Sequence, residues 1–410
     1  MNVAIIGAGS AGLMCACALS KKHSVTVLEK NSDAGKKLML TGKGRCNLTN
    51  LVKPCEFLQS VLQNSEFVKD SLLEFTPKDT VSFFEGIGVR VQAENNNRVF
   101  PSRDGASAVR YALQKHAELS GVKFIFNTTV ARINKKNCFK VVTFCLENKQ
   151  ESVLDFDIVI VATGGMSFPA TGSTGDGYAI AKKFGHNIIS PRAALCGMRL
   201  ETQIGLPGSS VNCSALIIDE KSIPVTETET GDMLFTKNGV SGPIVFRLTS
   251  MFKNSLIDKH FLQVNFAPNL VEEKLQARLI KMLKESSRKS LFYVFREFVP
   301  IAVANWLVEA SKLPKSKPCA NFTKLEIEKI FLMITQSRIP IIDFEDIKTA
   351  TITRGGIDVN KVDSNSMQSK LVSGLFFIGE VLDVDALSGG FNLQIAFSTA
   401  NSCAKALNQY

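Results

Sequence analysis

The hydrophobic pattern at the start of the chain predicts a strand, a turn and a helix. Residues 2–6 form a short apolar run rich in β-branched side chains, and residues 13–19 are small and apolar, as in a buried helix. Gly7-Ala-Gly9-Ser-Ala-Gly12 lies between them, and a second apolar run, residues 25–28, follows. The pattern therefore predicts a β-α-β unit with a glycine-rich first turn.

The pattern of apolar positions changes twice further along the chain. Strand and helix patterns alternate up to about residue 190, and short β-branched runs separated by turns then take over. Helical spacing follows, with Leu275 and Leu279 on one predicted face and Thr323-x-x-Glu326 as a capping box. Strand-like sequence resumes at residues 347–352.

These changes predict one discontinuous α/β domain with two insertions. The α/β domain is expected to consist of residues 1–190 and 345–410. A β-barrel-like insertion is expected at 191–268, with about 336–344 added to it, and a helical insertion at 269–335. The 410 residues are enough for about two to three domains.

Composition and charge narrow the function classes. The chain has 45% hydrophobic and 21% charged residues, which is typical of a globular protein, and we expect no membrane span. Its net charge is +10, but basic pairs alternate with acidic residues, so we expect a solvated surface and no nucleic-acid partner. The ten cysteines include no C-x-x-C pair, which favours reduced thiols in a cytoplasmic protein and no metal site. The oligomeric state stays open.

The glycine turn and Glu29 together predict a nucleotide site. Gly7 would form the tight turn, Gly9 would let the backbone approach a pyrophosphate, and Gly12 would allow the helix to pack closely on the strand. The amides of Ser10 and the residue after it would offer a partly positive helix N-terminus to that anion. Glu29 follows Gly7 by about twenty residues, within reach of the ribose hydroxyls, and we expect it to be exposed at the strand tip.

Two further segments favour FAD over NAD as the bound nucleotide. Residues 41–50 form a glycine-rich loop that is too polar for a simple β-α crossover. Residues 374–380 are predicted as a strand that runs into Gly379-Glu380, and a glycine-led helix follows from about Asn392. Flavoproteins use such a helix N-terminus to stabilise negative charge on the reduced flavin.

These motifs resemble a known family along nearly the whole chain. The blocks at residues 29–30, 35–38, 42–50, 162–165, 172–177, 234–236, 239–243 and 379–396 are similar, in order, to the BaiN/RdsA family of NAD(P)/FAD-dependent oxidoreductases, also described as aminoacetone-oxidase-like flavoproteins. Lys43 and Ala386-Leu387-Ser388 depart from the common family pattern. The resemblance implies a Rossmann-type FAD-binding domain of the two-dinucleotide-binding flavoprotein superfamily, interrupted by the two insertions.

The nucleotide motifs and the resemblance together indicate which residues contact FAD. The expected contacts are Gly7, Gly9, Ser10, Ala11, Gly12, Glu29, Lys30, Lys37, Arg45, Asn47, Val130, Thr163, Gly164, Gly379, Glu380, Asp383, Asn392, Leu393 and Gln394. No flavin-attachment motif is evident, so we expect FAD to be non-covalent. A second G-x-G-x-x-G is absent from the sequence, so NAD(P)H would bind only transiently as an electron donor.

A flavin transfers hydride itself, so no dedicated nucleophile is required. The candidates for a direct catalytic role are Arg45, Cys46 and Thr171. Arg45 could bind a phosphate or an anionic substrate, or form an ion pair that braces its loop. Cys46 has no partner cysteine two or three residues away, so a structural or flavin-contacting role is favoured over a redox thiol.

The sequence indicates an FAD-dependent oxidoreductase that moves a hydride between flavin and a small organic substrate. The favoured form is a C=C reductase with NAD(P)H as donor. Two alternatives stay open: an O2-using amine or amino-ketone oxidase, and a non-catalytic flavin-binding module whose redox state controls a partner.

Overall fold

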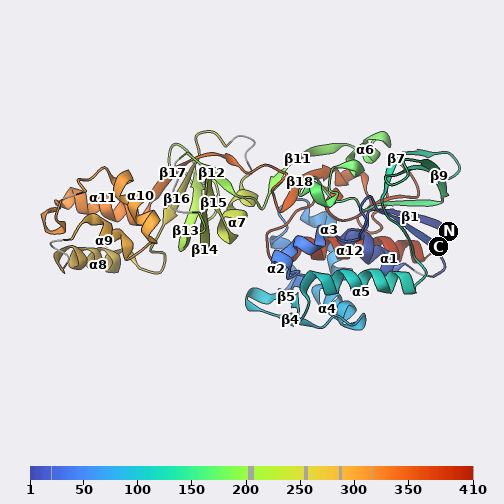
Figure 1. The fold of residues 1–410 in the computed structure, drawn as a ribbon, viewed down its shortest axis with the longest axis horizontal. Coiled ribbons are helices and arrows are strands. Elements are labelled where there is room, and N and C mark those ends of the chain that lie inside the picture. Colours follow the sequence, from blue (N-terminus) through green and yellow to red (C-terminus); the bar gives the residue numbers. More distant parts are fainter. Residues whose placement is uncertain (20, 202–206, 254–256, 286–288, 316, 410) are drawn as a thin grey trace. The chain divides into compact units, whose positions relative to one another are not determined.

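The chain folds into two units, one of which is built from both ends of the sequence. In this computed structural model, Met1–Ala194 and Ile347–Tyr410 form the first unit, and Leu195–Asp346 form the second (Figure 1). The structure describes residues 1–19, 21–201, 207–253, 257–285, 289–315 and 317–409. Of the expected insertions, residues 195–344 lie in the second unit, whereas residues 191–194 belong to the first.

A five-stranded parallel sheet forms the centre of the first unit. Its strand order is β19-β10-β1-β2-β6. These strands are β1 (Asn2–Ile6), β2 (Ser24–Leu28), β6 (Lys123–Ile125), β10 (Ile158–Val161) and β19 (Leu375–Phe377). The last four residues of β1 and all four of β10 are buried, because helices and loops cover both faces of the sheet.

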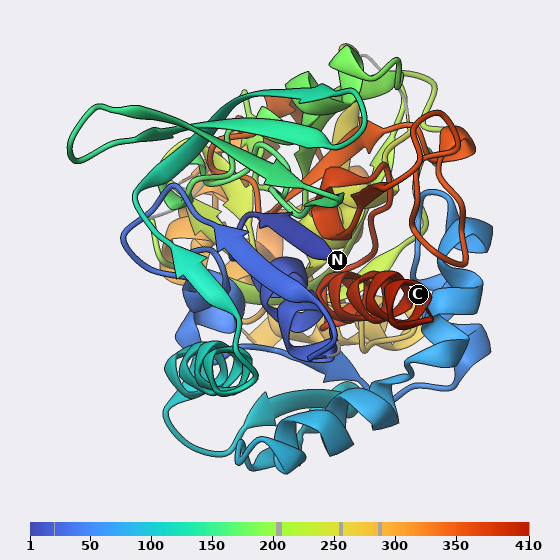
Figure 2. The same ribbon diagram turned by 90° about the vertical axis from the view of Figure 1, so that its right-hand side faces the viewer.

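Helix α1 (Ser10–Ala18) packs against both α12 (Phe391–Asn408) and α5 (Gly105–Leu119), as Figure 2 shows. The other helices of this unit are α2 (Pro54–Gln59), α3 (Ser65–Glu74), α4 (Pro77–Gly86) and α6 (Asp176–Lys183). Short 3-10 turns η1 (Leu38–Gly44), η2 (Asn95–Asn97), η3 (Pro169–Thr171), η5 (Val359–Lys361) and η6 (Gly379–Val381) connect them.

Three smaller antiparallel sheets complete the first unit. One contains β3 (Thr49–Asn50), β5 (Arg98–Pro101) and β4 (Val91–Ala93), and another contains β7 (Thr128–Lys135), β8 (Phe139–Cys145) and β9 (Glu151–Phe156). The third pairs β11 (Ile188–Ala194) with β18 (Ile352–Ile357). The strand expected at 347–352 is therefore wrong in position: the strand begins where the sequence prediction ended it.

The second unit contains a closed six-stranded barrel. Its order is β12-β15-β14-β13-β16-β17. The strands are β12 (Met198–Leu200), β13 (Ser210–Ile218), β14 (Glu229–Thr236), β15 (Gly239–Ser241), β16 (Phe261–Asn265) and β17 (Ser337–Phe344), and α7 (Pro243–Met251) packs on them. Alternate residues of β13 are buried, as expected when one face of a strand lines a barrel core.

Between β16 and β17, the described residues form four helices and one 3-10 turn. They are α8 (Glu272–Glu285), α9 (Leu291–Arg296), α10 (Ile301–Ser311), η4 (Cys319–Asn321) and α11 (Lys324–Thr335). The predicted capping box is confirmed: Thr323 accepts from the Glu326 amide, and the Glu326 carboxylate accepts from the Thr323 amide. Within the described residues, no helix is both long and apolar enough to cross a membrane.

Candidate functional site

The carboxyl ends of the central strands bring the predicted glycine turns together. Gly7 follows β1, Thr163 follows β10 by two residues and Gly379 follows β19 by two, and β10 lies between the other two strands. A Cβ atom on Gly7 would lie 2.6 Å from the Ala162 oxygen, and one on Gly379 would lie 2.7 Å from the Ala11 Cβ. The loops therefore meet at one edge of the parallel sheet, where α/β proteins bind nucleotides.

Gly9 and Gly12 are needed for different reasons. A Cβ on Gly12 would lie 2.0 Å from the Gly7 oxygen, so only glycine allows α1 to sit this close to β1. A Cβ on Gly9, the N-cap of α1, would meet no described atom within 4 Å. Open space therefore lies beside Gly9 at the N-terminus of α1, which begins at Ser10, and this arrangement fits a pyrophosphate group.

Glu29 lies at the end of β2 but is buried, at 7% exposure, so the expectation of an exposed side chain is wrong. Its Oε2 accepts from the Ala8 amide at 2.7 Å, and its Oε1 accepts from the Asn31 amide at 2.9 Å and from Asn31 Nδ2 at 2.7 Å. The glycine turn thus folds over the carboxylate and fixes its orientation. Oε1 already accepts two bonds, whereas Oε2 accepts one and has a second lone pair, so acceptance of a ribose hydroxyl at Oε2 is compatible with these contacts.

Lys37 and Glu380, both expected to contact FAD, contact each other. Lys37 Nζ lies 2.9 and 2.7 Å from the two Glu380 oxygens and 2.5 Å from Ser167 Oγ. Glu380 Oε1 also accepts from the Thr353 amide at 2.9 Å. This ion pair is three-quarters buried and ties the loop after β2 to the turn after β19. Lys30 pairs instead with Asp176, at 2.6 Å.

Gln394 and Asn392 brace the start of α12. Gln394 is fully buried, and its Oε1 accepts from Thr49 at 2.6 Å and from Thr80 at 2.8 Å. Its Nε2 donates to the Phe75 oxygen and to Ser398 Oγ, so every hydrogen-bonding position of the amide is occupied by protein groups. Asn392 holds the 386–387 backbone through bonds to both its N–H and C=O groups.

A buried ion pair that was not predicted from the sequence joins Arg354 in β18 to Asp385, which lies in the 379–396 block. Arg354 contacts Asp385 through Nε at 3.0 and 3.1 Å and through Nη2 at 2.5 Å, with both side chains at most 4% exposed. Burial, together with nearby Asp385, raises the pKa of the Asp383 carboxyl. Asn64 Nδ2 donates to the Asp383 carboxylate at 3.1 Å and to its carbonyl at 2.5 Å. The signal available in the sequence was the repeated acidic residue at 383 and 385.

The three candidate catalytic residues have protein partners. Arg45 is half exposed, pairs with Glu94 and lies over the Phe100 ring at 4.2 Å, which is the loop-bracing arrangement. Cys46 is fully buried, and burial raises the pKa of its thiol to about 12, so it is neutral at physiological pH. Thr171 Oγ1 donates to the Phe168 oxygen at 2.7 Å. None of these arrangements resembles an activated nucleophile.

Gly164, Val130 and Leu393 are further predicted contacts. Gly164 follows Thr163 with a φ of 71°, and a Cβ there would lie 3.2 Å from Ser173 Oγ. Val130 is in β7, two residues after Thr128, whose amide donates to the backbone carbonyl oxygen of Glu29. Leu393 lies half-buried in the first turn of α12.

Several buried polar atoms in or near the segments expected to bind FAD lack a partner among the described residues. Asn47 Oδ1, Asn50 Oδ1, Thr163 Oγ1 and Tyr178 Oη are buried and make no hydrogen bond within the described residues. Asn50 was not among the predicted contacts, but its Nδ2 donates to the Gly389 oxygen just before α12, at 3.0 Å. Buried polar groups without partners are rare in folded proteins. Three of the four lie in the segments expected to bind FAD, so these residues fit a polar cofactor.

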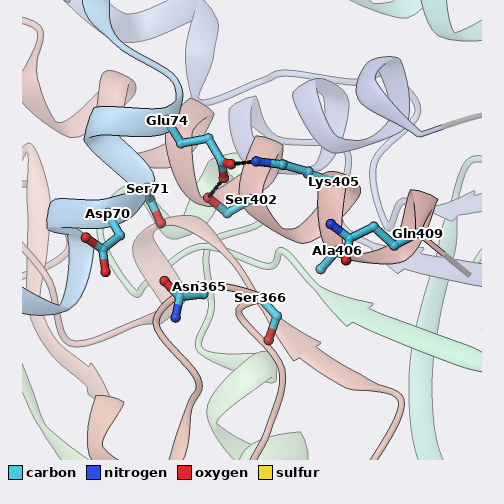
Figure 3. Close-up of a pocket in the computed structure, with 9 residues that line it drawn as sticks. All are labelled: Asp70, Ser71, Glu74, Asn365, Ser366, Ser402, Lys405, Ala406 and Gln409. Atoms are coloured by element: carbon cyan, nitrogen blue, oxygen red, sulfur yellow. Dashed lines mark hydrogen bonds and ion pairs between the residues drawn. The ribbon is translucent and has the colours of Figure 1, made fainter.

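A separate surface pocket of about 270 Å³ lies between α3, α12 and the 365–366 loop (Figure 3). Glu74 is central to it and accepts from Lys405 and, at 3.4 Å, from Ser402. Its lining residues are Asp70, Ser71, Glu74, Asn365, Ser366, Ser402, Lys405, Ala406 and Gln409, and none of them is an expected FAD contact.

Comparisons with known proteins agree with these motifs along the whole chain. The family model described as HI0933-like protein Rossmann domain matches residues 1–406. Ribosomal RNA dihydrouridine synthase from Haemophilus influenzae is 32% identical, with 99% of this chain and 98% of that protein covered. The Escherichia coli protein of the same name is 30% identical, with 98% and 97% covered. The 3-dehydro-bile acid delta(4,6)-reductase of Clostridium scindens is 26% identical, with 99% and 98% covered.

Solved structures show the same fold at low identity. A 3-ketosteroid-delta4-(5alpha)-dehydrogenase from Rhodococcus jostii has a TM-score of 0.55 and 13% identity, over 100% of this chain and 96% of that one. The E. coli quinol fumarate reductase subunit FrdA has a TM-score of 0.52 and 12% identity, over 100% and 70%. With the family match and the relatives above, the chain belongs to the HI0933-like Rossmann family, the FAD-dependent oxidoreductases that its motifs indicate.

Proposed function

We propose that this protein is an FAD-dependent reductase that saturates the C5=C6 bond of a uridine in ribosomal RNA, with NAD(P)H as electron donor. The support for the substrate is the pair of relatives named ribosomal RNA dihydrouridine synthase, at 32% and 30% identity over almost their full lengths. The charge pattern alone argued against a nucleic-acid partner, and these relatives are the reason to propose one.

The chemistry is common to the named relatives. In uridine the C5=C6 bond is conjugated with the C4 carbonyl, so a hydride can add to C6 while a proton adds to C5. A bile acid delta(4,6)-reductase likewise acts, by its name, on conjugated double bonds. Bound FAD would supply the hydride. Overall, NAD(P)H, one proton and uridine give NAD(P)+ and dihydrouridine, so atoms and electrons balance.

The chain's own residues would bind and orient the cofactor. Open space next to Gly9 at the α1 N-terminus would take the pyrophosphate, and Oε2 of the oriented Glu29 carboxylate would accept a ribose hydroxyl. The observation that carries the assignment is the group of buried atoms without partners among the described residues, Asn47 Oδ1, Asn50 Oδ1 and Thr163 Oγ1, which lie in two segments expected to bind FAD, 41–50 and 162–165. Gln394 would hold the start of α12 against β3 in a fixed position.

Two measurements test this function. Anaerobic mixing of the yellow holoprotein with NADH or NADPH should bleach the flavin, and unmodified ribosomal RNA should then restore its colour. Mass spectrometry of the RNA should show a two-hydrogen gain at one uridine.

The other candidate functions give different results in the same measurements. Bleaching by an amine, with recovery only when O2 is admitted, would indicate the oxidase. No bleaching with either nicotinamide or any amine would favour the redox-responsive module, and in both cases the reductase proposal would fail.

A further inference from the structure

Half of the net charge of the chain lies in the helical part of the second unit. Residues 269–335 contain twelve Lys and Arg and seven Asp and Glu, a net charge of +5 out of +10. This segment is about one-sixth of the chain, so the basic residues are not evenly spread. A basic excess on one small structural part is the electrostatic signature of a polyanion-binding surface.

Helix α8 carries a line of basic side chains on its exposed face. Lys274, Arg278 and Lys281 are spaced i, i+4 and i+7, which places them on one side of the helix, and all three are exposed. The opposite side of α8 is buried through Leu275, Leu279 and Leu283. We call Lys274, Arg278 and Lys281 the basic stripe.

The acidic residues that contact the basic stripe form only long, solvent-exposed ion pairs with it. Glu285 lies 3.7 Å from Lys281, and Glu297, at the end of α9, lies 4.0 Å from Arg278. All four side chains are at least 47% exposed, and surface ion pairs of this length contribute little free energy. A phosphate oxygen could therefore displace either carboxylate. Lys274 forms no ion pair within the described residues.

An exposed aromatic ring lies on α9, one helical turn before a residue that contacts the basic stripe. Helices α8 and α9 contact each other (Figure 1), and the Arg278 guanidinium lies 5.3 Å from the Phe298 ring centroid. Tyr293 lies four residues before Glu297, the residue that contacts Arg278, so the two side chains leave this helical segment on similar sides. Its ring is 51% exposed, and Lys289 lies over it at 5.4 Å. Basic side chains beside an exposed aromatic ring are typical of surfaces that bind unpaired nucleotides.

We propose that the basic stripe, Lys289 and Tyr293 form an RNA-binding surface in which the cations contact phosphates and Tyr293 stacks on a base. The proposal rests on the proposed function for its choice of RNA as the polyanion. The geometry gives a second reason for RNA over an acidic polypeptide, because an acidic side chain has no face to stack on an exposed ring.

The first experiment measures binding of a fluorescein-labelled oligouridylate to the holoprotein by fluorescence anisotropy across a salt series. The test variant is Lys274→Gln/Arg278→Gln/Lys281→Gln. Three lost phosphate contacts should reduce the slope of log K against log salt by about 2 and weaken binding by roughly 50-fold at about 0.15 M salt. The matched control, Lys78→Gln/Lys123→Gln/Lys182→Gln, removes three exposed charges from the first unit and should keep the wild-type slope.

The second experiment separates stacking from charge. Tyr293→Ala should weaken oligouridylate binding by roughly tenfold with an unchanged salt slope, whereas Tyr293→Phe should bind like wild type. Thermal unfolding and FAD content should match wild type in every variant, because the altered side chains are exposed.

Equal effects of the stripe and control variants would overturn the proposal, because binding would then follow net charge alone. Tyr293→Ala that binds like wild type, or polyglutamate that binds as tightly as oligouridylate, would also overturn it. These binding results do not depend on the proposed reaction, because that reaction is measured separately as dihydrouridine formation. A protein that forms dihydrouridine with an unchanged KM in the stripe variant refutes the surface and keeps the function, whereas stripe-dependent binding without dihydrouridine does the reverse.

Discussion

Replacing Gly9 with alanine tests where the nucleotide lies without disturbing the fold. Gly9 has φ −76° and ψ −170°, an extended conformation that any residue adopts, and its added Cβ would meet no described atom within 4 Å. The free energy of unfolding of the Gly9→Ala apoprotein should therefore lie within about 0.5 kcal/mol of the wild-type value. Gly12→Ala is the contrasting variant, because its Cβ would lie 2.0 Å from the Gly7 oxygen and must push α1 away from β1.

The effect on FAD follows from the space that the new methyl group would occupy. In the proposed site the pyrophosphate lies against the backbone at Gly9, so the methyl group must displace it or distort the turn. Inserting a methyl group into a close-packed contact costs about 1–3 kcal/mol. FAD affinity should therefore fall roughly 5- to 150-fold.

Titration of FAD into apoprotein, followed by flavin fluorescence, measures this change directly. Thermal unfolding of the two apoproteins is the control for folding. A Gly9→Ala protein that folds like wild type and binds FAD with equal affinity would refute the position assigned to the pyrophosphate. A stable Gly12→Ala protein would refute the packing argument for the turn.

Three further changes test neighbouring parts of the site. Glu29→Ala should weaken FAD binding and also destabilise the apoprotein by about 1–3 kcal/mol, because the Ala8 amide loses its buried acceptor; unchanged thermal unfolding would contradict this. Iodoacetamide should modify the exposed Cys55 of the native protein and leave Cys46 unmodified, since burial raises the pKa of the Cys46 thiol to about 12. Peptide mass mapping measures both rates, and modification of Cys46 at a rate similar to that of Cys55 would contradict this. Burial raises the pKa of the Asp383 carboxyl in the folded state. The ionised carboxylate therefore destabilises the folded state fully when the pH is above this raised pKa, and not at all when the pH is below the pKa of the unfolded chain. Asp383→Asn should therefore raise the melting temperature most at neutral pH and progressively less as the pH falls, and a gain independent of pH would refute the ionisation argument.

Local sequence was sufficient to predict the elements that are decided within a few residues. The glycine turn, the strand before it and the helix after it depend on backbone freedom at Gly7 and Gly12 and on a short apolar run. The capping box at Thr323 and Glu326 is likewise complete within four residues. The change from alternating elements to short β-branched runs predicted a strand-rich, barrel-like insertion, because strand composition responds to a half-buried pleated surface. The number of strands and their closure into a barrel are visible only in the structure.

The tertiary structure decided which of these elements contact each other and how the polar side chains are used. β18 starts at Ile352, not earlier, because pairing with β11 overrides the β-branched composition of the preceding residues. Glu29 is buried because the Ala8 turn closes over it, and Lys37 meets Glu380 from 343 residues away. Local propensity carries no record of such partners, since a hydrogen bond or ion pair between distant segments exists only after both have been brought to the same sheet edge.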